Sequence, residues 1–464
     1  MIKFIEARPR NLDFPHVGIA LGLASICLGQ ALQYQNGFLS IISLFYLTLS
    51  WIFLGWALFG RSTFGSSLFV KFSFLVLFLG LLLQIYQLAF TYLGDSQFLS
   101  LLPELWQFRT GILLAGGLAV ASLVLQKWVS SKWINLLTAL VLLTLGLSGI
   151  WLIKHEPYPF IDVFVFHQNS GYALLRGINP YTLTTPNIYG ESYIYAYGKE
   201  LIHNGILTIG NPYPPLSIYV STLGYLFGGD IRYSHLAAFL LAGVLIAFLY
   251  PGRDSKLAAY LFLFMPKSFY VIEQSWTEPI VVMFLMAFIY CAVHRPRWLP
   301  IMAGLLFASK QYLLFAFPLL LLLIPFEAPF LIWFRRFGVI VLTGLAVTIP
   351  LAVRNLPAFM WNVGQAQWYQ IFRLDALSYL AAYARVTDVQ PSQLTAFVVL
   401  ALTFFFVWRF LPRTPEGFAA AFSLCLILFF AFNKQAFCNY YFLVIGAMCA
   451  ALSALSPKLT TNFS

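Results

Sequence analysis

The chain has 464 residues, of which 61% are hydrophobic and only 9% are charged. A soluble protein of this length carries more charge, so the composition indicates a polytopic membrane protein. The net charge of +11 does not indicate nucleic-acid binding, because no basic patch interleaved with aromatic residues occurs, and basic cytoplasmic loops account for it better. The five cysteines are widely spaced in or beside apolar runs and give neither a zinc-binding pattern nor a disulfide framework.

The first part of the chain predicts five transmembrane helices. Lys3, Arg8 and Arg10 precede an apolar run that begins near Val17, and no clean cleavage site follows it, so we expect a first span and not a removed signal peptide. Helix-length apolar runs recur at about 38–59, 68–93, 110–126 and 133–153. Basic residues in alternate short loops place the N-terminus in the cytoplasm and the end of the fifth helix outside.

A long polar interruption, 154–212, follows on the outer side. The next apolar run, 213–228, starts at two prolines and is short for a span. If it crossed the membrane, Arg253 and Lys256 would lie outside, against the preference of basic residues for the cytoplasm. We therefore expect 213–228 to be a re-entrant or interfacial helix.

The remaining apolar runs complete the predicted fold. They lie near 232–250, 256–273, 276–294, 299–312, 313–326, 337–354, 391–411, 416–432 and 438–454. The expected fold class is an all-α polytopic bundle of about 14 transmembrane helices, with both termini inside, the whole net charge on the inner side and amphipathic juxtamembrane helices in the outer loop. We divide it into an N-terminal module of about four helices (1–130), a core (131–455) and a cytoplasmic tail (456–464). The core contains the outer loop 154–212 and a second outer segment, 355–390.

Asp162 opens the polar interruption and is the candidate catalytic residue. It follows Pro157 and Pro159, so it is expected at or near the start of an amphipathic helix that ends by Gly177. A carboxylate there is favoured by the unpaired N–H groups and the helix dipole, which is a structural explanation. The functional explanation is a general base that removes a proton from an acceptor hydroxyl at the membrane face.

The other polar residues of the outer loop have architectural alternatives. His167 lies about 140° around the helix from Asp162 and is interpreted mainly as an interfacial histidine. Gly177 and the following Asn-Pro-Tyr181 fit a helix C-terminus, and the prolines after Tyr213 fit a helix start. The loop tyrosines either stack on sugar rings or are ordinary interface residues; they are Tyr189, Tyr193, Tyr195 and Tyr197.

Charged residues near the bilayer are costly and therefore informative. Lys310, Lys434 and Arg354 are expected near outer helix ends, where they are candidates to hold a phosphate; snorkelling to the interface is the alternative, favoured for Arg354. The candidate substrate-binding residues are His167, Tyr181, Tyr213, Glu273, Gln274, Glu278, Gln311, Tyr312 and Asn439. The dispersed histidines give no metal pattern, so no cofactor is predicted, although a divalent cation, Mg or Mn, is left open.

The order of these motifs resembles a known group of enzymes. An Asp early in the first large outer loop, a helix ending in Gly-x-Asn-Pro-Tyr and a following Tyr-Pro-Pro-Leu are similar to the GT-C superfamily of integral-membrane glycosyltransferases. Within it, Ala308-Ser309-Lys310-Gln311-Tyr312 resembles glycosyltransferase family eighty-seven, a polyprenyl-phosphate-sugar-dependent, mannosyltransferase-like group. The resemblance covers about residues 133–455. About four helices precede the first helix of the resemblance, which departs from the usual pattern.

This resemblance implies that Asp162 is a base in an inverting sugar transfer from a polyprenyl-phosphate donor to a lipid, glycan or protein acceptor. The reaction is expected on the outer, periplasmic face of a bacterial inner membrane. The alternative is a transporter or flippase for lipid-linked sugars, which is expected to show inverted repeats and helices broken at the bilayer midplane. No internal repeat is evident, and the polar residues gather at one face.

Overall fold

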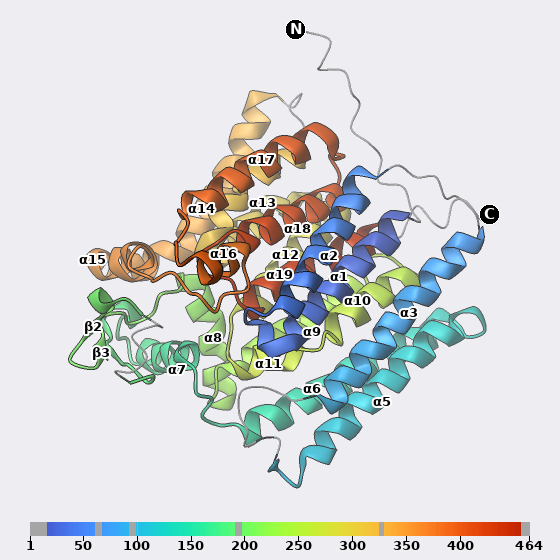
Figure 1. Cartoon of the computed structure of the whole chain (residues 1–464), viewed down its shortest axis with the longest axis horizontal. Coiled ribbons are helices and arrows are strands. Elements are labelled where there is room, and N and C mark those ends of the chain that lie inside the picture. Colours follow the sequence, from blue (N-terminus) through green and yellow to red (C-terminus); the bar gives the residue numbers. More distant parts are fainter. Residues whose placement is uncertain are drawn as a thin grey trace.

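The computed structural model describes residues 16–60, 67–91, 99, 101–190, 197–323 and 329–455. The predictions made for Lys3, Arg8 and Arg10, for Tyr193 and Tyr195, and for the tail 456–464 lie outside these residues. Helices make up almost all of the regular structure that is described (Figure 1).

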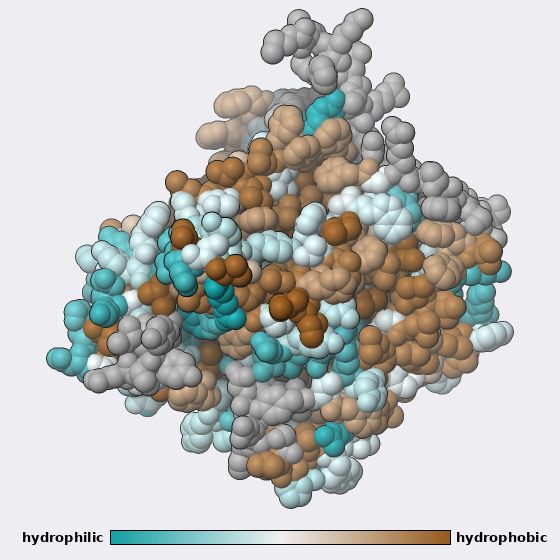
Figure 2. All heavy atoms as spheres, viewed as in Figure 1, coloured by the Kyte–Doolittle hydropathy of each residue, from teal (hydrophilic) through white to brown (hydrophobic). Residues whose placement is uncertain are grey.

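The described residues contain six helices long and apolar enough to cross a membrane, so the chain has the multi-pass character that its composition predicts. They are α1 (His16–Gln33), α2 (Ile41–Phe59), α3 (Ser67–Phe90), α5 (Leu105–Val124), α6 (Ser131–His155) and α14 (Phe330–Ala352). Short 3₁₀ turns follow α1 and α5, at Tyr34–Gly37 and Leu125–Lys127. Figure 2 shows hydrophobic side chains over much of the helical part of the visible face.

The other apolar helices are shorter. The set comprises α9 (Arg232–Ala247), α10 (Arg253–Leu263), α12 (Glu278–His294), α13 (Leu299–Ser309), the 3₁₀ helix η7 (Gln311–Leu322), α17 (Leu394–Phe410), α18 (Pro415–Ala431) and α19 (Cys438–Ala454). A 3₁₀ turn, Pro296–Trp298, joins α12 to α13.

Two of the predicted spans are broken in the structure. The run predicted at 256–273 divides into α10 and the short α11 (Ser268–Glu273), with Pro266 in the break, because proline cannot donate the helical hydrogen bond. The predicted pair 299–312 and 313–326 divides earlier, at Lys310, whose backbone is extended (φ −153°, ψ 135°). Lys310 therefore lies between two helical segments, where its side chain can turn toward the outer loop.

The N-terminal helices are part of the same bundle as the core. Of the candidate spans, α1 has 83% of its apolar window buried, whereas α14 has only 6%. α1 packs against α2, α10 and α19, and the side chains of Gln30 and Gln87 exchange two hydrogen bonds of 2.7 and 2.8 Å. The proposed module 1–130 therefore contributes the most buried of the candidate spans.

The outer loop folds over the end of this bundle. It contains α7 (Asp162–Leu175), two 3₁₀ turns (Pro180–Thr182 and Lys199–Leu201) and a small antiparallel sheet in the order β1-β3-β2. The strands are Thr185–Pro186, Ile202–His203 and Ile206–Leu207. The all-α expectation did not include this sheet, because strands of two residues are too short to show an alternating pattern. Hydrophilic side chains gather near the β2–β3 end (Figure 2).

α7 packs on α8 (Pro215–Gly228) and on the turn that follows it. Gln168 donates to the carbonyl of Gly229 at 2.7 Å and accepts from the N–H of Ile231 at 3.2 Å. α8 and α9 meet at 112°, and Gly229 adopts a left-handed conformation (φ +75°) at the corner. Both ends of α8 thus contact the outer loop, and the expectation of a re-entrant or interfacial helix at 213–228 stays a prediction.

The second outer segment connects the outer loop to the bundle. It contains α15 (Leu356–Phe359), a π-helical turn (Met360–Gly364), a 3₁₀ turn (Gln365–Gln367) and α16 (Tyr379–Thr387). Oδ1 of Asn362 accepts hydrogen bonds from the backbone N–H groups of Gly210 and Asn211 at 2.7 and 3.0 Å. Its Nδ2 donates to the carbonyl of Tyr181 at 3.0 Å, so this one buried amide joins the two outer segments.

Candidate active site

Asp162 is the first residue of α7, as the sequence predicts. The preceding Ile161 is extended, so the chain turns into the helix at Asp162 itself. Oδ1 accepts a 2.7 Å hydrogen bond from the N–H of Val163, and Oδ2 accepts one from the hydroxyl of Tyr197. The N–H of Asp162 donates to the hydroxyl of Tyr189 at 3.2 Å. Both carboxylate oxygens are therefore held in place at the helix start.

The surroundings of Asp162 favour the protonated form more than water does. Burial raises the pKa of Asp162, whereas hydrogen bonds from Tyr197 and Val163 and the positive charge of Arg373 lower it, and burial prevails. The side chain nevertheless remains partly exposed. A carboxylate with a raised pKa that is still open to a second reactant is suited to general base chemistry.

Tyr213 lies between Asp162 and the bundle. Its ring centroid is 4.7 Å from that of His167 and 4.4 Å from Nζ of Lys310. Burial raises the pKa of Tyr213 well above its ordinary value, and the charges of Asp162 and Glu278 raise it further. The turn before α8 therefore joins the carboxylate of the outer loop to the charged pair of the bundle.

The charged pair consists of Lys310 and Glu278. Nζ of Lys310 lies 2.9 Å from Oε1 of Glu278 and donates to the hydroxyl of Thr277 at 2.7 Å. The same Oε1 accepts from the hydroxyl of Tyr312 at 3.2 Å and from Nδ2 of Asn439 at 3.0 Å. Oε2 of Glu278 is buried without a hydrogen-bond partner among the described residues. Three predicted site residues, Lys310, Tyr312 and Asn439, therefore converge on one carboxylate oxygen of a fourth, Glu278.

Three further predicted residues shape the site. Nε2 of Gln311 donates to the carbonyl of Pro212 at 2.8 Å, and the hydroxyl of Tyr181 donates to the carbonyl of Tyr213 at 2.7 Å. These bonds fix the turn that carries the Tyr213 ring. His167 is buried, and burial lowers its pKa well below its ordinary value; within the described part of the chain neither ring nitrogen has a hydrogen-bond partner. Its neutral ring is held by packing against Tyr213.

The remaining predicted residues lie elsewhere or have local roles. Arg354 hydrogen-bonds to the carbonyl of Gly177, at the end of α7 opposite Asp162, and a helix of 14 residues separates the two by about 20 Å. Nζ of Lys434 donates to the carbonyl of Gln370 at 2.6 Å and so joins two loops. The structure thus places Arg354 at the end of α7 that is far from Asp162. Two buried neighbours stand at the end of α11, namely Glu273 and Gln274.

Arg373 belongs to the site but was not selected from the sequence. Its guanidinium binds Asp375 through two hydrogen bonds of 2.8 and 2.6 Å. Its charge lowers the pKa of Asp162. The Arg-x-Asp spacing in an outer segment was the available signal. Tyr189 and Tyr197 were interpreted mainly as interface residues, yet both hydrogen-bond to Asp162.

The described residues contain no group of three or more His, Cys, Asp or Glu side chains placed to hold a metal ion. Chemically, the arrangement offers a partly exposed carboxylate, tyrosine hydroxyls and rings, and two cations, the buried Lys310 and the partly exposed Arg373, that are each paired with a carboxylate. Aromatic rings and hydrogen-bonding groups of this kind can contact a polar ring such as a sugar.

No protein-family model and no curated protein matches this sequence. Among solved structures, the chain is similar to the crystal structure of ArnT from Cupriavidus metallidurans bound to undecaprenyl phosphate, with 15% sequence identity and a TM-score of 0.42. The similarity covers 72% of this chain and 63% of that protein. Similarity at this level assigns neither a fold nor an activity to this chain.

Proposed function

We propose that the protein is a membrane glycosyltransferase that moves a sugar from a polyprenyl-phosphate donor to an acceptor hydroxyl on the outer, periplasmic face of a bacterial inner membrane. The acceptor class is a lipid, a glycan or a protein. The observation that carries the proposal is the position of Tyr213 where the outer loop meets the helix bundle. Its ring centroid lies 4.4 Å from Nζ of Lys310, the partner of Glu278, and the charge of Asp162 raises its pKa.

In the proposed reaction, Asp162 accepts the proton of the acceptor hydroxyl while that oxygen forms a bond to the anomeric carbon. The bond between the anomeric carbon and the phosphate oxygen breaks, and the phosphate leaves with the electron pair. One attack from the opposite face inverts the configuration. Because a phosphate departs without a proton from the protein, a single carboxylate suffices, unlike the acid and base pair of glycoside hydrolysis.

The site also suggests how substrates are held. Oε2 of Glu278 and Oε1 of Gln311 are buried acceptors that no described donor meets. Sugar hydroxyls are donors, so we assign these two oxygens to recognition of the donor sugar. The ring of Tyr213, fixed by Gln311 through Pro212 and by Tyr181, is placed to lie along the sugar.

We assign the donor phosphate to Lys310, whose Nζ lies 4.4 Å from the centroid of the Tyr213 ring, and to Arg373, whose positive charge lowers the pKa of Asp162. Each is already paired with one carboxylate, Glu278 or Asp375, so a phosphate adds to an existing pair. We retain Lys434 as a further candidate contact to the phosphate, although in the structure its Nζ donates to the carbonyl of Gln370. Arg354 is given no part in phosphate binding, because it lies at the far end of α7.

The test is transfer of labelled sugar in proteoliposomes, with wild type compared with Asp162→Asn. The asparagine keeps the shape of the side chain and removes the base. We expect transfer to fall by at least about a hundredfold while the variant remains folded and still binds donor. Normal transfer by the variant would mean that Asp162 only stabilises the start of α7.

The transporter alternative is supported by one observation, the sharp break between α8 and α9. The same proteoliposomes distinguish the two functions when movement of the labelled lipid between leaflets is measured without acceptor. Lipid movement without any sugar transfer from any polyprenyl-phosphate donor would favour the transporter.

A further inference from the structure

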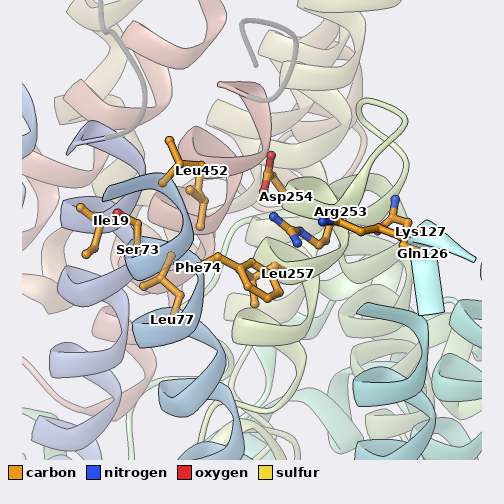
Figure 3. A pocket seen from close by; sticks show the side chains of 11 residues that line it. Ile19, Ser73, Phe74, Leu77, Gln126, Lys127, Arg253, Asp254, Leu257 and Leu452 are labelled. Atoms are coloured by element: carbon orange, nitrogen blue, oxygen red, sulfur yellow. The ribbon is translucent and has the colours of Figure 1, made fainter. Parts of the chain in front are cut away.

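A second potential binding site lies at the other end of the bundle. A cavity of about 300 Å³ opens between the first turns of α3 and α10, beside the end of α5 (Figure 3). α6 separates it from the candidate active site, since α6 begins just after Lys127 at the cavity and ends just before Asp162. A helix of 25 residues is about 37 Å long, so the two sites face opposite sides of a membrane.

The walls of this cavity are of two kinds. Most of the lining is apolar and comes from four helices; examples are Ile19, Phe74, Leu257 and Leu452. At one side the polar groups of Arg253, Asp254 and Lys127 gather, as Figure 3 shows. The cavity is thus an apolar slot with a charged rim.

The rim carries a positive charge that is not neutralised by ion pairs. The guanidinium of Arg253 lies 3.7 Å from the centroid of the Phe74 ring. Within the described residues, neither Arg253 nor Lys127 forms an ion pair with a carboxylate. With Asp254 counted, the rim has one net positive charge, and it is set at the N-terminus of α10, where the helix dipole adds to the positive potential.

The two kinds of wall call for a ligand with both properties. A free phosphate would leave the apolar slot unfilled, and a purely apolar molecule would leave the cations of the rim without a negatively charged partner. A phospholipid with an anionic headgroup supplies the negative charge at the rim and an acyl chain for the slot. The volume is at the lower end of small-molecule sites, about 300–1,000 Å³, so it accommodates a phosphate and the upper part of one chain.

We propose that this cavity binds an anionic phospholipid of the leaflet opposite the candidate active site. The sequence predicts that this leaflet is the cytoplasmic one, whose surface is negatively charged in many membranes. Bound there, the lipid contacts helices of the N-terminal module and of the core together, namely α1, α3, α10 and α19. A lipid that binds only the folded state stabilises that state by mass action. Because it contacts both the N-terminal module and the core, it would hold the two parts together.

The experiment measures lipid binding to the delipidated full-length protein in a neutral detergent. Phosphatidylglycerol is titrated and followed by native mass spectrometry and by the melting temperature, with phosphatidylcholine and inorganic phosphate as separate arms. The variants are Lys127→Gln/Arg253→Gln, which removes the charged rim, and Val70→Trp, which narrows the slot at a partly exposed lining residue. Lys132→Gln is the matched control, because it removes an exposed charge at the same membrane face outside the cavity.

We expect phosphatidylglycerol to bind wild type and Lys132→Gln alike and to raise their melting temperatures. The double variant is expected to bind phosphatidylglycerol at least about tenfold more weakly than wild type. Val70→Trp is expected to lose the bound lipid but to have a normal melting temperature in the absence of lipid. Equal binding of phosphatidylcholine, or equal loss in Lys132→Gln, would overturn the proposal. Stabilisation by inorganic phosphate that matches the lipid would also overturn it, in favour of a free-anion site. None of these measurements depends on transferase activity.

Discussion

Nζ of Lys310 lies 2.9 Å from Oε1 of Glu278, and both side chains are withdrawn from solvent. The two residues belong to different elements, Glu278 to the first turn of α12 and Lys310 to the extended break after α13. The backbone at the break is itself tied to the outer face, because Ser217 of α8 donates to the carbonyl of Ser309 at 2.5 Å. The pair therefore joins three elements at the candidate active site.

The first prediction concerns this pair. Glu278→Gln leaves the buried ammonium of Lys310 without its counter-charge, so we expect it to destabilise the protein by about 3–5 kcal/mol. Lys310→Met is expected to destabilise similarly, by leaving the carboxylate unpaired. The double variant removes both charges and is expected to lose much less than the sum of the single variants. Thermal unfolding of the four proteins in one detergent completes the cycle, and strict additivity would show that the charges do not interact.

The second prediction concerns the hydroxyl of Tyr197. It donates to the carboxylate of Asp162 and lowers the pKa of that group, so Tyr197→Phe is expected to raise the pKa further. If ionised Asp162 is the base, transfer is lost as the pH falls through this pKa, and the acid limb of the kcat/KM profile moves to higher pH in the variant. We expect several-fold lower activity at the acid end and a smaller effect at high pH. The control is Tyr172→Phe, which removes the hydroxyl of an exposed tyrosine on α7, the helix that begins at Asp162.

The third prediction tests Arg373. Its positive charge lowers the pKa of Asp162, so Arg373→Gln is expected to move the acid limb of kcat/KM in the same direction as Tyr197→Phe. If Arg373 also contacts the donor phosphate, the variant has a higher KM for the donor at every pH. Arg385→Gln removes an exposed charge from the same outer segment and should leave both parameters unchanged. An unaltered profile in Arg373→Gln would remove this residue from the site.

The fourth prediction concerns the end of α7. Gly177 adopts a left-handed conformation (φ +73°), which costs an alanine about 1–2 kcal/mol. Gly177→Ala is therefore expected to lower the melting temperature, and Gly177→Asn to lower it less, because asparagine tolerates this conformation better. Gly117→Ala is expected to raise the melting temperature. This position is inside α5 and has open space for a Cβ, and alanine has a higher helix propensity than glycine.

Local rules predicted the parts of the molecule that depend on neighbouring residues. The start of α7 at Asp162 and its end before Gly177 follow from prolines, a carboxylate and a glycine within one short stretch. The apolar runs predicted the helices, because membrane spans carry their signal in composition. The break at Lys310 falls inside the run predicted at 299–312, so the sequence placed the end of this helix a few residues too late.

Long-range contacts limited the remaining predictions. Arg373 reaches the site because its own backbone N–H donates to the carbonyl of Lys434 at 3.1 Å, across a sequence separation that no local pattern encodes. The role of Tyr197 depends on the outer loop folding back onto Asp162. Tyrosine is also an ordinary residue of membrane interfaces, so its occurrence in the loop does not distinguish the two roles.

The backbone of the segment around Arg373 has a consequence for biosynthesis. On one side, the N–H of Leu39 donates to the carbonyl of Asp375 at 2.9 Å; on the other, the N–H of Leu377 donates to the carbonyl of Ala436 at 2.8 Å. The segment is thus held between the loop that follows the first helix and the loop that precedes α19. A ribosome delivers these two loops far apart in time, so the two hydrogen bonds that hold the segment are complete only after the loop before α19 has been made. The position of Arg373 is therefore fixed late in the synthesis of the chain.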